Sequence, residues 1–177
     1  ICPFVKTHMS IYISEQRMSK QTTRIATRNL NFDVALSTEN FHKGFISQWM
    51  HLDRLDGVGL NTRFHLHFTD AYVHSAKREP VEFFKTLLEE NLPANNLIDS
   101  DFVTINGVLA AKYGLNGHYS GNGFQKVSLD ANSPRGGLIT QASFLAIGTM
   151  GNRTSPVIRG SLVKEILLND PPPPPPP

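Results

Sequence analysis

The chain has 177 residues, a formal net charge of +2, 40% hydrophobic residues and 18% charged residues. This composition is that of a globular protein with one ordinary domain or two small ones. The net charge is too small to indicate a nucleic-acid or membrane-surface partner, and no apolar run reaches the length of a transmembrane segment. The single cysteine, Cys2, excludes an internal disulfide framework and any Cys-x-x-Cys motif for zinc or haem attachment.

The two ends of the chain indicate a fragment or processed piece of a longer protein. The chain begins with Ile1, shows no charged-then-apolar signal sequence and stops within a run of prolines. Residues 1–30 have no clear period, so we expect a poorly defined N-terminal segment there. Their basic residues form no arginine cluster interleaved with aromatics, which disfavours a basic arm for nucleic acid.

The first clear helical pattern runs over about residues 38–55. Ser37 or Thr38 can accept a hydrogen bond from the first turn, and the glycine pair Gly57 and Gly59 should end the segment. Such a pattern is typical of a core-facing helix, so we expect its apolar stripe to be buried. The stripe consists of Phe41, Phe45, Ile46, Trp49 and Leu52.

Two further helices are predicted in the middle of the chain. The second should begin after Thr69, whose side chain can cap it. Pro80 interrupts its pattern, because an interior proline removes a hydrogen bond and clashes with the preceding turn. Either two helices meet near Glu79 or one helix kinks there. A third helix is predicted over about residues 100–113, with Gly114 as its left-handed C-terminal cap.

The last third of the chain alternates turns with short apolar patterns. Residues 124–129 alternate apolar and polar side chains, which predicts a short strand. A short helix should end near Gly148, and Pro156 suits the first position of a final helix. Residues 171–177 are all proline and predict an extended polyproline II tail. Together the patterns predict a mostly α, irregular helical fragment with at most a small β element and a polyproline C-terminal tail.

Motifs for catalysis and metal binding are weak. His65 and His67 are two residues apart, with His74 further on, and side chains at this spacing converge on a metal only from a strand. They lack the His-Glu-x-x-His spacing of a helical zinc site, so partly exposed loop histidines are the favoured interpretation. Ser161 and Lys164 match the Ser-x-x-Lys pattern of an activated serine, but its companion motifs are absent. The sequence therefore predicts no metal site and leaves catalytic residues unknown.

Three arginines are the candidate ligand-binding residues. Arg135, Arg153 and Arg159 lie next to glycines or near predicted helix starts, where backbone N–H groups point outward. Guanidinium groups beside free N–H groups can bind an anion, or can cross-link the carbonyls and carboxylates of loops. Cross-linking is favoured, and ligand binding is the alternative that stays open. Thr154 and Ser155 are further candidates for the same ligand.

Several motifs carry a resemblance to a pair of adjoining domains of unknown function found in large planctomycete proteins, often alongside a planctomycete c-type cytochrome domain. The second domain is similar over Arg135 to Leu138, Gln141 to Ser143, Arg153 to Val157, Arg159-Gly160 and the proline run. The first domain is similar at Phe45-x-x-Gln48-Trp49, Phe83-Phe84 and Asn106 to Gly114. Pro80 and residues 1–30 depart from the family pattern.

The resemblance implies a division of the chain and a setting for it. Residues 31–130 would form a helical domain like the first family domain, and residues 131–170 a truncated second domain. They would follow the N-terminal segment 1–30 and precede the tail 171–177. The family offers no catalytic residues to transfer, and no cytochrome motif lies in this chain. Haem c is therefore expected, if anywhere, in another part of the parent protein, which the resemblance places in the periplasm or outside the cell.

The sequence thus supports a non-catalytic or scaffold portion of a secreted or cell-envelope bacterial protein associated with c-type cytochrome electron transfer. Its expected partners are other domains of the same parent chain. The alternative is an oxidoreductase or hydrolase with an anion-binding pocket between the two domains, so whether the chain is part of an enzyme stays open.

Overall fold

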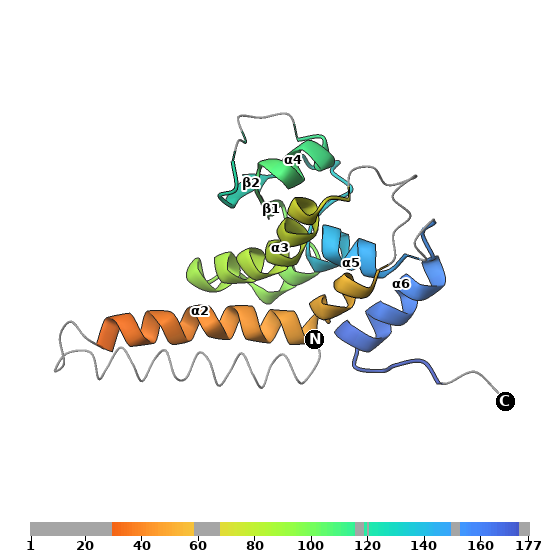
Figure 1. The fold of residues 1–177 in the computed structure, drawn as a ribbon, viewed down its shortest axis with the longest axis horizontal. Coiled ribbons are helices and arrows are strands. Elements are labelled where there is room, and N and C mark those ends of the chain that lie inside the picture. The colour runs from red at the N-terminus through yellow and green to blue at the C-terminus, as the bar shows by residue number, and fades with distance from the viewer. Residues whose placement is uncertain (1–29, 59–67, 116–118, 120, 150–152, 174–177) are drawn as a thin grey trace. The chain divides into compact units, whose positions relative to one another are not determined.

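The computed structural model describes residues 30–58, 68–115, 119, 121–149 and 153–173 (Figure 1). The chain divides into two compact units, one of residues 42–160 and one of residues 1–41 with 161–177. The expected boundary between residues 130 and 131 falls inside the larger unit. The described residues are mostly helical, with one two-stranded antiparallel sheet, as predicted. None of their helices has the length and hydropathy needed to cross a bilayer.

The first described helix, α2, covers Leu30–Trp49 rather than residues 38–55. Ser37 and Thr38 lie within it, so the predicted cap is wrong. The helix ends before the glycines because His51 adopts a left-handed conformation, with φ of 50°. A 3₁₀ helix, η1 (Leu52–Gly57), follows at once. A left-handed residue interrupts the series of α-helical hydrogen bonds, and histidine gives little warning of it in a sequence.

The apolar stripe of this region is only partly buried. Ile46 and Leu52 are in the core, whereas Phe45 and Trp49 keep some exposure. The Phe45 ring stacks on that of Phe84, with 5.4 Å between centroids, and lies 5.5 Å from that of Trp49. Of the stripe residues, Phe45, Ile46 and Leu52 therefore pack within the larger unit, and the expected burial holds only in part because Phe45 and Trp49 keep some exposure.

Helix α3 (Asp70–Glu89) begins as predicted, with the Thr69 side chain accepting a hydrogen bond from the Tyr72 N–H. Pro80 lies inside this single helix, so the alternative of two helices meeting near Glu79 is wrong. Pro80 and Glu79 both lie in the interior of the protein. Burial of the proline ring offsets part of the cost of the hydrogen bond that its nitrogen cannot donate.

The predicted third helix is wrong in its first half. Residues Phe102–Ile105 form strand β1, and helix α4 covers only Gly107–Tyr113. Three consecutive β-branched residues, Val103 to Ile105, favour the strand. Asn106 then caps α4 by accepting the Leu109 N–H, and Gly114 ends it with φ of 67°, as predicted.

Strand β1 pairs with β2 (Gln125–Ser128), the strand predicted over residues 124–129. The pairing is antiparallel, with Val103 opposite Val127. All four residues of β1 are buried, so this short strand lies within the core rather than at its surface. Between α3 and β1 the chain forms a short 3₁₀ helix, η2 (Ala94–Leu97).

The C-terminal elements follow the predicted order. They are η3 (Leu138–Thr140), α5 (Ala142–Ile147) and α6 (Pro156–Leu162), followed by a π-helical turn, η4 (Val163–Leu167). Pro156 occupies the first position of α6, as predicted. Of the proline run, residues 171–173 are exposed and without regular secondary structure, and residues 174–177 lie outside the described part of the chain.

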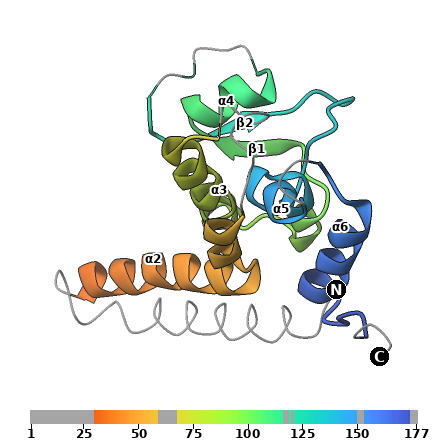
Figure 2. The same ribbon diagram turned by 45° about the vertical axis from the view of Figure 1, so that its right-hand side comes forward.

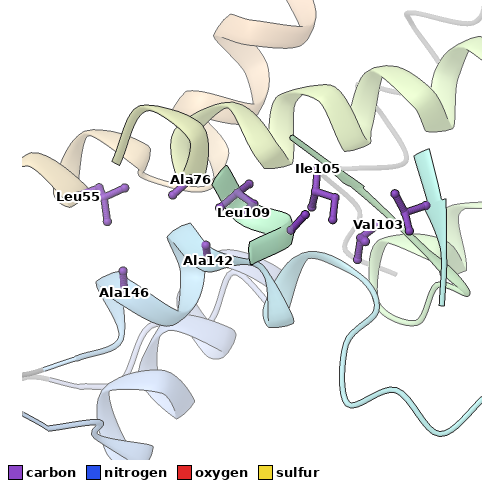
Figure 3. Packing of buried hydrophobic residues seen from close by; sticks show 9 residues of the cluster. Leu55, Ala76, Val103, Ile105, Leu109, Ala142 and Ala146 are labelled. Carbon is purple, nitrogen blue, oxygen red and sulfur yellow. The ribbon is translucent and has the colours of Figure 1, made fainter. Parts of the chain in front are cut away.

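The core of the larger unit joins α5 to the elements that precede it. Figure 3 shows Ala142 and Ala146 of α5 facing a cluster that includes Ala76 of α3 and Leu109 of α4. Figure 2 shows α5 beside α3, which the two alanines and Ala76 permit because small side chains allow close approach of helices. The full cluster is Leu55, Ala76, Val103, Ile105, Leu109, Ala110, Val127, Ala142 and Ala146.

Candidate functional site

Arg135, the first of the candidate arginines, is held against α4 and η3. Its guanidinium carbon lies 3.5 Å from the centroid of the Tyr113 ring. Its Nη1 donates a hydrogen bond to the Thr140 carbonyl oxygen at 3.0 Å. A partly buried cation over an aromatic face contributes about 0.5–2 kcal/mol. Arg135 therefore cross-links two segments, as the favoured interpretation of the sequence predicts.

Tyr113 also contacts a carboxylate with no solvent exposure, that of Glu79. The Tyr113 hydroxyl donates to it, at 2.6 Å from Oε1 and 2.8 Å from Oε2. The backbone N–H of Ala142 donates to Oε2 at 2.9 Å and also lies 2.9 Å from the Tyr113 oxygen. We call Glu79, Tyr113, Arg135 and the Ala142 N–H the Glu79 centre.

Local sequence chemistry places each member of the Glu79 centre. Glu79 lies on the buried face of α3, between Ala76 and Phe83. Tyr113 is the last residue of α4, and Ala142 is the first residue of α5. The N–H groups of a first helical turn have no partner within their helix and carry partial positive charge. A buried carboxylate can therefore satisfy the Ala142 N–H.

Burial controls the protonation of the Glu79 centre. Desolvation raises the pKa of Glu79 to about 7, against the opposing effects of the Tyr113 hydroxyl, the Ala142 N–H and the Arg135 charge. The pKa of Tyr113 is raised well above its usual value by burial and by Glu79. Burial, and then Glu79, also raise the pKa of Tyr72. The raised pKa values keep the Tyr113 phenol of the centre and the nearby Tyr72 phenol neutral at neutral pH, and they bring the ionisation of Glu79 toward neutral pH.

Two glycines fix the turn that carries Arg135. A Cβ on Gly136 would lie 2.4 Å from the Ser100 carbonyl oxygen, and one on Gly137 would lie 2.3 Å from that of Ile98. Gly137 also has φ of 72° with ψ of 176°, a conformation essentially restricted to glycine. The Thr140 hydroxyl accepts the Gly136 N–H at 2.9 Å. Because of these close approaches, the turn packs directly against the loop that precedes β1.

Arg135 also lines a pocket of about 350 Å³. Three carboxylates, Asp99, Asp101 and Asp130, line the same pocket. The pocket therefore combines one guanidinium with three acidic groups, a balance that repels anions. The remaining lining residues are Asn96, Ser100, Leu129, Ala131 and Ser133.

The other candidate residues lie on and before α6. Arg153 and Thr154 are exposed, and Thr154 forms a β-bridge with Thr149. Ser155 caps α6 by accepting the Ile158 N–H at 3.3 Å. The side chain of Arg159 covers Gly148, where a Cβ would lie 2.6 Å from the arginine Cγ. Arg135 and Arg159 thus contact different elements, and ligand binding by the five candidates stays a prediction.

The hypotheses of a histidine metal site and of a lysine-activated serine gain little support from the described part of the chain. His74 is exposed on α3, while His65 and His67 lie outside the described residues. Among described residues no group of three or more histidine, cysteine, aspartate or glutamate side chains can hold a metal ion. Lys164 pairs with Asp170 at 3.1 Å, so its ammonium is engaged by a carboxylate.

Sequence reasoning did not single out Glu79 or its partners. In the sequence, Tyr113 stands out only as part of the family motif Asn106 to Gly114, and Glu79 only as the site of a possible helix boundary or kink. One signal was present: Glu79 falls three residues after Ala76 and four before Phe83, at a core position of the helical repeat. A carboxylate at such a position predicts a buried partner.

Two family models match the chain. The model described as PSD4, Protein of unknown function (DUF1592), matches residues 14–115. The model described as PSCyt3, Protein of unknown function (DUF1588), matches residues 135–177. Both describe planctomycete domains of unknown function, the pair that the sequence motifs resemble. No curated protein and no solved structure is detectably similar to the chain.

Proposed function

The chain belongs to the PSD4 family of proteins of unknown function (DUF1592), followed by a PSCyt3 segment, and from this membership we propose that it is a structural, non-catalytic portion of a larger protein. Such domains are associated with planctomycete cytochrome-containing proteins. In the proposed role, the PSD4 and PSCyt3 segments of the chain form one rigid support for neighbouring domains of the same parent. The proposed parent is a secreted or cell-envelope protein that takes part in c-type cytochrome electron transfer.

The hydrogen bond from Ala142 to Glu79 carries this proposal. Glu79 and Tyr113 lie in the PSD4 match, whereas Arg135 and Ala142 lie in the PSCyt3 match. A buried carboxylate that loses a hydrogen-bond donor incurs a desolvation cost of about 1–3 kcal/mol or more. The Glu79 centre therefore makes the stability of each segment depend on the other, which is what a joining element requires.

The same geometry argues against general acid or base catalysis by Glu79. A catalytic carboxyl group must come within hydrogen-bonding distance of a substrate proton. Glu79 has no exposed surface, both of its oxygens are engaged by protein donors, and neither it nor Tyr113 lines the pocket beside Arg135. Its raised pKa thus follows from burial in a structural network, a known second origin of such shifts.

The proposed association with electron transfer places haem c outside this chain. Covalent attachment of haem c uses two cysteines in a Cys-x-x-Cys-His motif, and the chain has only Cys2. The residues present therefore do not fit a covalently attached haem. The proposed contribution of the chain is to position a neighbouring haem domain of the same parent.

An enzyme with an anion-binding pocket is the second candidate, because Arg135 lines a pocket. The three aspartates of that pocket disfavour an acidic substrate. A melting temperature that rises with added phosphate in the wild type, and not in Arg135→Ala, would favour this candidate over the structural one.

A visible absorption spectrum of the full-length parent, purified from its native envelope, tests the proposal. We expect a Soret band, with α and β bands that appear on reduction by dithionite. Glu79→Gln in the parent should leave the haem content and the rate of haem reduction unchanged while altering the melting temperature. A parent without haem, or a slower reduction rate at unchanged melting temperature, would contradict the proposed role.

A further inference from the structure

One ionisable group lies at the contact between the PSD4 and PSCyt3 segments. Glu79 of α3 accepts hydrogen bonds from Tyr113 at the end of α4 and from the first N–H of α5. We propose that Glu79 makes the docking of residues 135–147 on α3 and α4 dependent on proton concentration, the neutral carboxyl group favouring the docked state and the carboxylate favouring local opening. This inference rests on the structural role proposed for the same contact.

The hydrogen bonds are compatible with both protonation states of Glu79. A neutral carboxyl group donates from one oxygen to Tyr113 and accepts the Ala142 N–H at the other. A carboxylate only accepts, from the Tyr113 hydroxyl and from Ala142. The difference between the two states is therefore the charge itself, in a site without solvent exposure. A buried charge is relieved when water reaches it.

The groups that face Glu79 reduce this penalty without removing it. Tyr113 of α4 donates to the carboxylate, Ala142 of α5 contributes only its backbone N–H, and Arg135 contributes a positive charge above the Tyr113 ring. Tyr72 of α3 is neutral over the relevant range. Burial outweighs them, and the pKa of Glu79 rises to about 7, which places its ionisation near neutral pH.

Opening of residues 135–147 is the response that exposes the carboxylate. The first N–H of α5 contacts Glu79 directly, and α5 is only six residues long. Ala142 and Ala146 pack on the common core through small side chains, as Figure 3 shows. The same segment also buries Leu138 and Phe144, so its undocking would expose these two side chains together with Glu79.

Amide hydrogen exchange of the full 177-residue chain between pH 5 and pH 8 tests the inference. After correction for intrinsic exchange rates, we expect the open population reported by Ala142 and the α5 amides to rise on the order of 50-fold over this range. Amides in the middle of α3 exchange only through openings that also expose Glu79, so a rise of similar size is expected there. In Glu79→Gln, where the side chain is neutral at every pH, the profile should be flat.

Two further variants keep the test decisive. Arg135→Gln removes the charge that favours the carboxylate, so the rise should extend to higher pH, and it can be followed even where Glu79→Gln does not fold. His42→Gln removes a buried histidine of the same unit and should leave the profile unchanged. A rise that survives in Glu79→Gln, or that disappears in His42→Gln, would overturn the inference.

The outcomes also separate this inference from the proposed structural role. Protection of the α5 amides at every pH, without a rise, would overturn the proton dependence and leave the structural role standing. An α5 unprotected at every pH would overturn both, because the two segments would then not be joined.

Discussion

The Glu79 carboxylate accepts a hydrogen bond at 2.9 Å from the backbone N–H of Ala142, a residue 63 positions further along the chain. The bond crosses from the PSD4 match to the PSCyt3 match, so two domains of unknown function share one buried polar centre. Neither segment can satisfy this centre alone. A carboxylate without its donors, or a helix start without its acceptor, would remain in the interior.

We expect the free energy of unfolding to fall as pH rises from about 4.5 to about 7. Because burial raises the pKa of Glu79 from 4.5 to about 7, the folded state binds more protons than the unfolded state between these values. The contribution of Glu79 is thus fully present below pH 4.5 and is lost as pH rises through 7. The total loss in the free energy of unfolding is on the order of 3 kcal/mol. Urea unfolding of the wild type and of Glu79→Gln across this range measures how the free energy of unfolding of each depends on pH. The two proteins should show the same pH dependence if Glu79 is not the cause.

Tyr113→Phe should destabilise the protein by about 1–3 kcal/mol. The change removes only the hydroxyl that donates to Glu79 and keeps the ring beneath Arg135. Because that hydrogen bond lowers the pKa of Glu79 in the folded state, its loss should also extend the pH-dependent decline in stability to higher pH. Tyr72→Phe is the matched control. Equal effects of the two substitutions would mean that the hydroxyl bond to Glu79 has no special role.

Gly137→Ala should cost more stability than Gly114→Ala. Both glycines have positive φ, 72° and 67° respectively, so both substitutions strain the backbone. A Cβ at residue 114 meets nothing within 4 Å, whereas one at residue 137 would lie 2.3 Å from the Ile98 carbonyl oxygen. We expect about 1–2 kcal/mol for Gly114→Ala and a clearly larger loss for Gly137→Ala. Thermal unfolding of the two variants measures the two losses of stability. Similar melting temperatures would argue that the turn does not pack tightly against the loop before β1.

Arg135→Ala should destabilise the chain by about 1–3 kcal/mol, through loss of its contact with Tyr113 and its hydrogen bond to Thr140. Arg153→Ala should change stability by no more than about 0.5 kcal/mol, because Arg153 is exposed. Arg135→Lys should fall between them, since lysine keeps the charge but loses the planar stacking. Chemical denaturation measures all three. A larger loss for Arg153→Ala than for Arg135→Ala would reverse the assignment of roles.

Features set by neighbouring residues were predictable from the sequence. The Thr69 cap, the Gly114 cap, the Pro156 helix start and the strand over residues 124–129 each depend on a few adjacent residues. The helix expected over residues 100–113 was wrong where strand pairing with β2 outweighed local helical spacing. The end of α2 at the left-handed His51 likewise had no strong local signal.

The Glu79 centre was harder to predict because its members are far apart in the chain. Tyr113 lies 34 residues from Glu79, and Ala142 contributes only a backbone group. Of its members, the sequence singles out Arg135, as a loop cross-link or an anion ligand, while Tyr113 and Ala142 lie only within family motifs. A carboxylate at a core position of a helix signals that some partner exists, but only the packing of α4 and α5 against α3 identifies it.

Native-state hydrogen exchange at pH 5, comparing the amides of α3 with those of α5, tests most directly whether the PSD4 and PSCyt3 segments form one unit. At this pH Glu79 is mostly neutral, and the account predicts that both helices exchange through the same opening, with free energies within about 1 kcal/mol of each other. Exchange of α5 through an opening several kcal/mol easier than that of α3 would contradict it, because the PSCyt3 segment would then be an independent attachment.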